Sequence, residues 1–332
     1  MDATTPKLSK NVMDSFRTML NGRINVSFDE FVGWALYDSK IGYYKRKQKR
    51  VGKGKEDDFY TSTTLGKTWG ELIIASSIEL LKDGLPSHYC FVEIGAEPDR
   101  SVFDGLTHPF SDHKIIKHGD PFDIPEKAVV YSNEWLDARP FKRFKYSRTQ
   151  GCWLEIFVGL ENCNLKEFEK ISLDMEDYPF PAEAPDGYCI DWPSGSISSL
   201  NDLIQNKPWA GIFMTFDYGL DLKTICKDRP EGTARAYSKH KMDSELLSDP
   251  GSKDLTCHIC WDSVKKSLEF NGFKQVELTS QESFFIKHAS GYMQKLFEQS
   301  RDRLNPQMLA LKEIIHPAHL GHGLQALYGI RA

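Results

Sequence analysis

The chain contains no apolar run close to the roughly 20 residues that a membrane-spanning helix needs. Its first residues, MDATTPKLSKNVMDSF, have neither the apolar core of a secretory signal nor the arginine content of a mitochondrial presequence. An excess of positive charge is also missing, because 42 basic residues are set against 47 acidic ones and the net charge is −5. These absences predict a cytoplasmic protein that binds neither membranes nor nucleic acid.

A disulfide framework and a metal site are not expected either. The seven cysteines have no framework spacing, which favours reduced thiols. Cys257 and Cys260 form one Cys-x-x-Cys pair, but no second pair completes a zinc site. We predict a strand here, which would place the two thiols on opposite faces. Three histidines near the C-terminus, His316, His319 and His322, have no acidic residue nearby.

What the sequence does contain is a mixture of helix and strand patterns. The chain has 332 residues and 40% hydrophobic content, which suits one large α/β domain with additions, or two domains. A capping box, Ser27 followed by Glu30, starts one helical stretch. We predict helices over 10–37, 65–82, 196–207, 263–271 and 293–315. We predict strands over 89–95, 113–120, 128–132, 153–158, 211–217, 254–261, 273–278 and 283–287.

Polar residues follow three of these strands. In an open α/β sheet, ligands bind beyond the carboxyl ends of the strands. The segment AVVYSNEWLDARPFKR ends one strand with Asn133 and Glu134, and Asp137 follows. The other two ends are Glu93–Gly95 and Asp217–Gly219, so we expect three acid-bearing strand ends at one edge. The simpler alternative is that Asn133 or Asp137 only caps a helix or turn.

Two loops leave alternatives open. The basic run KRKQKRVGKGK predicts either a solvated loop or a positively charged lid for an acidic partner. The segment Asp57–Thr64 contains Tyr60, Thr61 and Ser62 and precedes a helix, whose N-terminus attracts anions. Helix capping alone would also explain these residues.

Several segments match one family in the same order along nearly the whole chain. They are FDEFVGWALYDSKIGYY, DDFYTST with GKTWGELI, FVEIGAE, VVYSNEWLDARPF, FDYG, GTARAYSKH, PGSKDLTCHICWDSV and LGHGLQALYG. They resemble the MidA-like family of class I methyltransferases that depend on S-adenosylmethionine (SAM). The mitochondrial member of that family is an arginine methyltransferase needed for the assembly of respiratory complex I.

The resemblance implies a Rossmann-like α/β fold with a seven-stranded sheet, an added N-terminal helical part and SAM as methyl donor. Alternating residues around Trp153–Val158 indicate an antiparallel insertion in that fold. We therefore expect an N-terminal cap over 1–86 and a methyltransferase domain over 87–332, with the insertion at about 142–195. A protein acceptor is expected, and a homodimer is left open.

Methyl transfer needs an in-line nucleophile, and an arginine acceptor needs carboxylates to hold its guanidinium. The resemblance and these needs assign roles as follows. The predicted catalytic residues are Glu134, Asp137, Asp217 and His258; the cofactor-binding residues are Glu93, Gly95, Asp120, Asn133, Tyr60, Thr61 and Ser62; the substrate-binding residues are Tyr43, Tyr218, Arg235 and Tyr237.

One motif departs from the family. The family's first-strand turn resembles E-x-G-x-G-x-G, whereas Glu97 and Asp99 replace the second and third glycines here. Side chains there would crowd the methionine end of SAM, where backbone must approach closely. This motivates two further hypotheses: a weak or inactive relative that acts as a binding or assembly factor, and a methyltransferase for small molecules.

Overall fold

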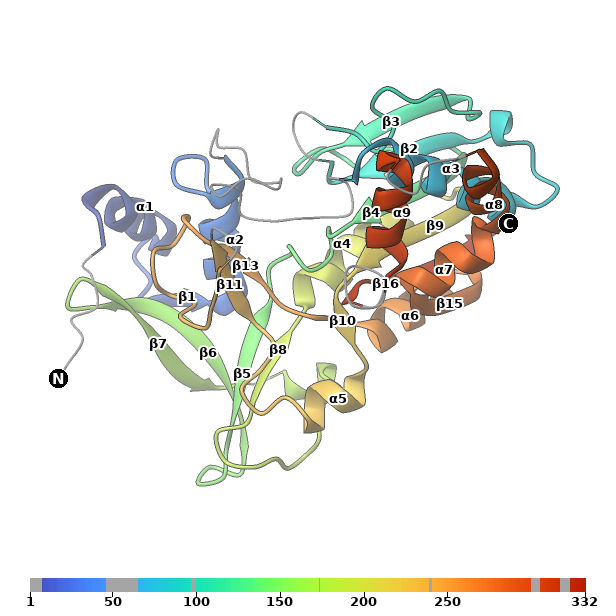
Figure 1. Cartoon of the computed structure of the whole chain (residues 1–332). Helices are drawn as coiled ribbons and strands as arrows, with labels where there is room; N and C mark the ends of the chain where they lie inside the picture. The colour runs from blue at the N-terminus through green and yellow to red at the C-terminus, as the bar shows by residue number, and fades with distance from the viewer. Residues whose placement is uncertain are drawn as a thin grey trace. The chain divides into compact units, whose positions relative to one another are not determined.

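The structure is a computed structural model, and it describes residues 8–45, 65–96, 100–172, 174–238, 241–299, 305–316 and 323–332 (Figure 1). The chain forms two compact units. Unit 1 comprises Met1–Phe59, Leu136–Ser198 and Leu220–Cys260, and unit 2 comprises Tyr60–Trp135, Ser199–Gly219 and Trp261–Ala332. Both units are therefore built from three separate stretches of sequence.

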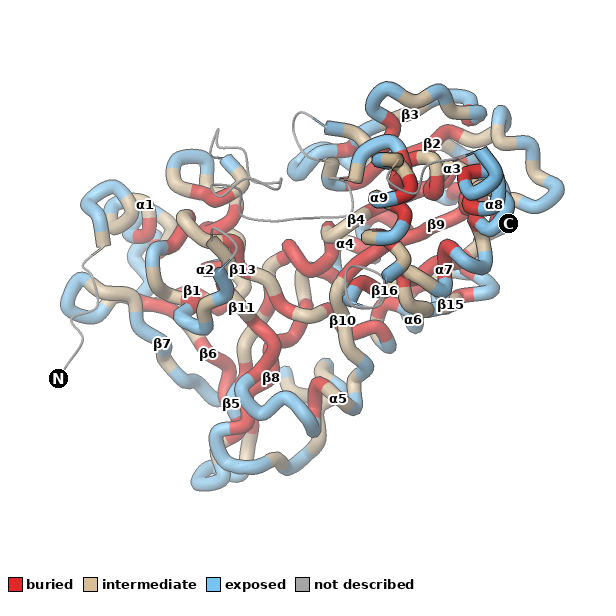
Figure 2. The backbone as a smooth tube through the Cα atoms, viewed as in Figure 1, coloured by how far each residue is buried: buried red, intermediate tan, exposed pale blue. Residues whose placement is uncertain are grey.

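Unit 2 contains a six-stranded sheet. In spatial order its strands are β3 (Asp112–Ile116), β2 (Cys90–Ile94), β4 (Lys127–Asn133), β9 (Ala210–Asp217), β16 (Gln325–Arg331) and β15 (Lys274–Ser280). The first four run parallel, and β16 is antiparallel to both β9 and β15. The central strands β2, β4 and β9 are buried along most of their length (Figure 2). The resemblance implied a seven-stranded sheet, whereas this sheet has six strands among the described residues.

Helices cover this sheet. They are α3 (Lys67–Leu81), α6 (Trp261–Phe270), α7 (Gln281–His288), α8 (Ser290–Gln299), α9 (Pro306–Ile315) and most of α4 (Ser194–Gln205). Residues of α3, α7, α8 and α9 share one hydrophobic core with one face of the sheet. There the indole of Trp69 packs edge-on against Phe216 and donates a hydrogen bond of 2.8 Å to the Tyr131 hydroxyl. Val92 and Val130 lie outside that core yet are fully buried, so the other face is covered as well.

Unit 1 contains an antiparallel sheet. Strand β6 (Cys152–Glu161) pairs with β1 (Asn25–Ser27), β5 (Lys142–Ser147) and β7 (Asn164–Ile171), and β8 (Cys189–Trp192) pairs with β5. A second sheet consists of β12 (Lys241–Asp243), β11 (Arg235–Ser238) and β13 (Asp254–Thr256). The helices are α1 (Lys10–Leu20), α2 (Phe28–Tyr37) and α5 (Leu222–Lys227), with single turns η1 (Tyr43–Lys45) and η4 (Met175–Asp177). The expected antiparallel insertion is confirmed, and the N-terminal segment adds a strand to it.

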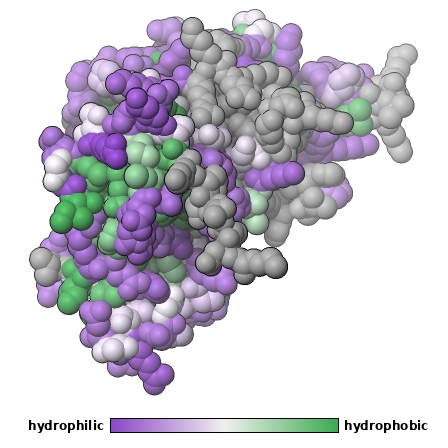
Figure 3. Space-filling model, turned by 90° about the vertical axis from the view of Figure 1, so that its left-hand side faces the viewer, coloured by the Kyte–Doolittle hydropathy of each residue, from purple (hydrophilic) through white to green (hydrophobic). Residues whose placement is uncertain are grey.

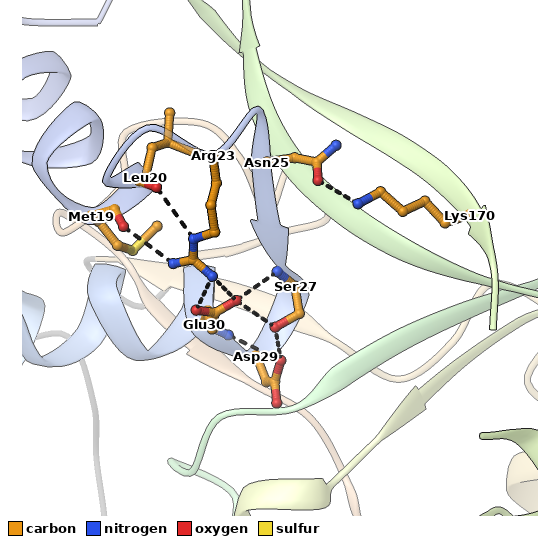
Figure 4. A network of polar contacts seen from close by, with 8 residues as sticks. All are labelled: Met19, Leu20, Arg23, Asn25, Ser27, Asp29, Glu30 and Lys170. Atoms are coloured by element: carbon orange, nitrogen blue, oxygen red, sulfur yellow. Dashed lines mark hydrogen bonds and ion pairs between the residues drawn. The ribbon is translucent and has the colours of Figure 1, made fainter. Parts of the chain in front are cut away.

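The predicted capping box forms at the start of α2 (Figure 4). The Glu30 carboxylate accepts a hydrogen bond of 3.1 Å from the Ser27 amide. Arg23 donates two hydrogen bonds to the same carboxylate, at 2.8 and 3.1 Å. This network fixes the start of α2, whose Phe28 packs against Phe141, the residue directly before β5. The cap therefore joins two stretches more than 100 residues apart in sequence.

Four local predictions were wrong, and one strand of the unit 2 sheet was missed. Residues 10–37 form two helices separated by β1, and the single helix predicted over 293–315 is replaced by α8, which ends at Gln299, and α9, which begins at Pro306. The predicted strand 254–261 is interrupted: β13 ends at Thr256, β14 comprises Ile259–Cys260, and Trp261 begins α6. Both cysteines are buried. Residues 283–287 lie in α7, because the Ser280 hydroxyl accepts a hydrogen bond from the Ser283 amide and caps a helix. Strand β16 was not predicted.

The remaining elements are short. Strand β10 (Gly219–Leu220) and β14 lie where the chain passes between the units, and turn η3 (Pro86–His88) precedes β2.

Figure 3 shows hydrophobic side chains gathered in places on a mostly hydrophilic face. Ile24, Ile171 and Met242 are among the exposed large apolar residues of unit 1, and single exposed residues of this kind are normal on a folded surface. Among the described residues, no helix has the length and apolarity needed to cross a membrane.

Candidate functional site

The register of the unit 2 sheet places the three predicted strand ends side by side. Ile94 of β2 pairs with Ser132 of β4, and Asn133 of β4 pairs with Phe216 of β9. The residues that follow each strand therefore meet at the carboxyl edge, where parallel sheets bind ligands. Gly95, Asn133–Glu134 and Asp217 occupy this edge.

Gly95 makes the tight turn that ends β2. Its φ is +74°, in the left-handed region, and its amide donates a hydrogen bond of 2.9 Å to the Ile116 carbonyl. A Cβ added at this position would lie 2.8 Å from Cδ1 of Trp135, which follows Glu134. Only glycine satisfies both conditions, so the backbone of this turn can pack directly against the Trp135 side chain.

Glu93 is buried and fully engaged by the protein. Its carboxylate accepts hydrogen bonds from the Ser101 hydroxyl at 2.8 Å and the Val102 amide at 3.0 Å, and His113 Nε2 lies 3.2 Å away. These contacts position the segment that follows the Gly95 turn. We had predicted a cofactor-binding residue here, and the contacts favour an indirect role through that segment.

Asp120 lies four residues beyond β3 and is exposed. Its carboxylate accepts a hydrogen bond of 2.9 Å from the Lys117 amide, which closes a turn. The end of a strand next to the glycine turn is where Rossmann-like folds place the acidic residue that holds ribose hydroxyls. The position of Asp120 is thus compatible with its predicted cofactor role.

Asn133 and Glu134 form a pair at the end of β4. The Asn133 side-chain amide donates a hydrogen bond of 3.1 Å to Glu134 Oε1. Its oxygen, Oδ1, is buried and has no hydrogen-bond partner among the described residues. Glu134 has a φ of +47°, which is costly for a residue with a Cβ, and its amide donates to the Phe216 carbonyl at 2.8 Å. Such strain is typically retained where it serves a site.

Asp217 and Tyr218 end the neighbouring strand β9. Asp217 is completely buried, and its Oδ1 accepts a hydrogen bond of 2.9 Å from the Tyr218 amide. A Cβ on Gly323 would lie 3.9 Å from the Tyr218 ring, so the segment before β16 passes close to that tyrosine. Asp217 is therefore better placed to support the edge from below than to contact a ligand directly.

Some predicted residues fall outside the described residues. They are Tyr60, Thr61 and Ser62 of the proposed cofactor set, Glu97 and Asp99 of the altered turn, His319 and His322, and most of the basic run after Lys45. Their predicted roles stay predictions.

Asp137, Tyr43 and Tyr237 belong to unit 1, where the structure reveals a cluster of tyrosines and carboxylates. Tyr44 stacks on Tyr37 with ring centroids 5.4 Å apart, and Tyr43 packs edge-on against Tyr44. The Tyr44 hydroxyl donates a hydrogen bond of 3.1 Å to Asp254, whose Cα is paired across the sheet with that of Tyr237.

Electrostatics ties these groups together. Burial, and then the nearby charge of Asp254, raises the pKa of Tyr44. Burial also raises the pKa of Tyr237, with Asp137 and Asp254 adding to the shift and Arg235 opposing it. Arg139 lies with its guanidinium 5.6 Å from the centre of the Tyr37 ring, a cation–π contact. The cluster thus combines the group types that hold cations, and two of them, Asp137 and Asp254, are buried.

The GTARAY segment has a structural explanation. Asp191 of β8 is buried and accepts hydrogen bonds from the Thr233 and Ala234 amides at 2.7 and 2.8 Å. A Cβ on Gly232 would lie only 2.1 Å from the same carboxylate, so glycine is required. Arg143 forms an ion pair with Asp191 at 3.2 Å.

The same arrangement positions His258, whose amide donates a hydrogen bond of 3.2 Å to the Thr233 hydroxyl. Burial, reinforced by the charges of Arg229 and Arg235, lowers the pKa of His258 to about 4. The imidazole is therefore neutral at pH 7 and a weak base, which favours a structural histidine over the predicted proton acceptor. Arg235 itself donates to the Ala234 carbonyl at 2.6 Å.

Sequence reasoning missed Tyr37, Tyr44, Asp254 and Asp191. Tyr37 and Tyr44 lie within FDEFVGWALYDSKIGYY, and Asp254 begins DLTCH, so the signal was present as matched segments without an assigned role. The described residues contain no group of three or more His, Cys, Asp or Glu residues able to hold a metal ion.

Comparison with known proteins identifies the family. Residues 78–279 match the model of a family described as "Putative S-adenosyl-L-methionine-dependent methyltransferase". That segment includes all seven carboxyl-edge residues discussed above, from Glu93 to Tyr218. The chain belongs to this family. The MidA-like resemblance and SAM as the family's cofactor are thereby confirmed.

Solved structures agree on the fold. A Burkholderia thailandensis protein crystallised with S-adenosyl-homocysteine superposes with a TM-score of 0.81 at 17% identity, over 99% of this chain and 95% of that one. A native structure of a protein of the same superfamily from that organism gives a TM-score of 0.78 at 16% identity, with the same coverage. The expected Rossmann-like methyltransferase fold is confirmed.

A curated relative is the mitochondrial protein arginine methyltransferase NDUFAF7 homolog of Drosophila melanogaster. It is 23% identical over 307 residues, which cover 73% of this chain. The match spans 66% of the relative, just under two thirds of its length. That relative is mitochondrial by name, and our expectation of a cytoplasmic protein stays a prediction.

Proposed function

We propose that this protein transfers a methyl group from SAM to an arginine side chain of a protein. The observation that carries the proposal is the carboxyl edge of the unit 2 sheet, where Gly95, Asn133 and Glu134 meet by register. Family membership supports the donor, and the name of the fly relative supports the acceptor.

The described residues of this edge fit SAM. Gly95 adds no side chain of its own to the tight turn after β2, where the methionine end of SAM would need close backbone contact. Asp120 lies four residues beyond the adjacent strand β3, where its carboxylate would accept hydrogen bonds from ribose hydroxyls. When bound, SAM supplies an activated methyl group on a sulfonium.

The acceptor needs a different environment. A guanidinium nitrogen must lie in line with the methyl carbon and the sulfur. As the new N–C bond replaces the S–C bond, this nitrogen loses one proton, which passes to the carboxylate that holds the guanidinium or to solvent. A carboxylate holds the guanidinium with paired hydrogen bonds and balances its charge. Glu134 is the carboxylate at this edge whose unusual backbone conformation favours such a role.

A labelling experiment tests the proposal. The full chain is incubated with S-adenosyl-[methyl-³H]methionine and a lysate depleted of small molecules, and labelled protein is hydrolysed to amino acids. We expect label in methylarginine, and E134Q should abolish it while leaving S-adenosyl-homocysteine (SAH) affinity within about twofold. Label in methyllysine or only in small molecules would refute the proposed acceptor. Absence of any label, with SAH bound, would favour the binding or assembly factor.

A further inference from the structure

The side-chain oxygen of Asn133 is a buried hydrogen-bond acceptor that the described protein leaves unsatisfied. Its orientation is fixed, because the side-chain nitrogen donates to Glu134 Oε1 at 3.1 Å. Buried carbonyl oxygens are nearly always hydrogen-bonded, so one without a donor calls for an explanation. Its place at the carboxyl edge suggests that a ligand supplies the donor.

Asn133 and Glu134 together offer neighbouring acceptors, an amide oxygen and a carboxylate. The hydrogen bond between them keeps both oxygens in one small region, and the left-handed backbone of Glu134 sets its side chain at the end of β4. A ligand that carries donors and positive charge, and no acceptor, matches this pair. An arginine guanidinium has five donors in a planar fork and no acceptor.

We infer that Asn133 binds the methyl acceptor and, with Glu134, holds its guanidinium; this rests on the proposed function. The inference moves Asn133 from the cofactor set, where the sequence had placed it, to the acceptor set. The methionine end of SAM matches this pair less well, because it carries a carboxylate as well as an ammonium, and Glu134 would repel the carboxylate. The ribose also fits less well, since its hydroxyls have an acidic partner available in Asp120.

Two small probes separate the chemistry. Nα-acetyl-arginine amide carries the guanidinium, and Nα-acetyl-citrulline amide has nearly the same shape without the charge. Binding of each to the full chain, saturated with SAH, is followed by saturation-transfer NMR titration. We expect the arginine probe to bind at least tenfold more tightly than the citrulline probe.

The variants then locate the contact. N133A should weaken binding of the arginine probe by about tenfold or more. Its SAH affinity, measured by calorimetry, should stay within about twofold of the wild-type value. The control is S132A, which removes the preceding buried hydroxyl and its 2.8 Å hydrogen bond to Thr215. It should leave the affinities for the arginine probe and SAH unchanged. If N133A does not fold, the isosteric N133D keeps an oxygen in place and should bind the arginine probe at least as tightly as wild type.

The inference is overturned if N133A binds the arginine probe as wild type does, or if N133A loses SAH affinity instead, which would return Asn133 to the cofactor. Failure of wild type to bind the arginine probe, or a tenfold loss in N133D with SAH affinity intact, would also overturn it. None of these outcomes contradicts SAM dependence. Failure of wild type to bind SAH would instead contradict the proposed function itself.

Discussion

Replacement of Gly95 by alanine should damage the carboxyl edge for two separable reasons. The first is backbone conformation: a φ of +74° costs a residue with a Cβ about 1–2 kcal/mol. The second is space, since the new Cβ would lie 2.8 Å from Cδ1 of Trp135, which is itself buried. Overpacking of this kind costs typically about 1–3 kcal/mol more. We therefore expect G95A to lose about 2–5 kcal/mol of unfolding free energy in total.

Gly119 provides the matched control. It follows the neighbouring strand β3, its φ is +90°, and an added Cβ would have no heavy atom within 4 Å. G119A should therefore incur only the conformational cost of about 1–2 kcal/mol. The difference between the two variants isolates the contact with Trp135.

Urea unfolding gives the stabilities, and calorimetry gives SAH affinity. G95A should be about 1–3 kcal/mol less stable than G119A, and it should bind SAH at least tenfold more weakly. Equal stabilities would refute the packing argument. A G95A variant that retained full SAH affinity would show that the turn after β2 does not contact the cofactor.

Three further predictions concern unit 1. His258 takes up a proton below pH 6.5 in the unfolded state but only near pH 4 in the folded state, so the unfolding free energy of wild type should fall by up to roughly 3 kcal/mol as the pH drops from 6.5 to 4. Urea melts at pH 5 and pH 8 should show a smaller fall for H258Q than for wild type. The same pH dependence in both proteins would contradict the lowered pKa. D191N leaves the Arg143 guanidinium without its charged partner and should cost about 3–5 kcal/mol by urea unfolding, whereas a cost below about 1 kcal/mol would contradict the role of this pair. Y44F removes the 3.1 Å hydrogen bond to Asp254 and should lower the unfolding free energy by about 1–3 kcal/mol, and an unchanged melting temperature would count against it.

Local signals in the sequence predicted local structure well. The capping box at Ser27 formed because both of its partners lie within one turn of helix. The strands ending at Ile94, Asn133 and Asp217 could be predicted because each is a short apolar run in the sequence. The structure shows that these strands are buried along most of their length. Their shared carboxyl edge then followed from the geometry of parallel sheets.

Features that depend on distant partners were missed. Strand β16 exists because it fits between β9 and β15, which are far away in sequence. The tyrosine cluster needs Tyr44 from the N-terminal segment and Asp254 from a point 210 residues later. The role of Asp191 likewise depends on amides at 233 and 234, which no spacing in the sequence connects to it.

The candidate site was predicted only in part, for the same reason. The positions of Gly95, Asn133 and Glu134 just after predicted strands marked them as candidate site residues. Which residues face a ligand and which only support the site depends on their hydrogen bonds, and the sequence does not show these. The position of Glu93 predicted a cofactor-binding residue, and the hydrogen bonds that its carboxylate accepts from Ser101 and Val102 favour an indirect role. The domain bounds at 86 and 87, and the roles of the remaining site residues, stay predictions.

The most direct test of the central claim, that the carboxyl edge of unit 2 binds SAM, is a calorimetric titration of the full wild-type chain with SAH. We predict saturable binding at one site per chain, and its loss in G95A but not in G119A. The absence of both binding heat and a thermal shift at millimolar SAH would contradict the claim.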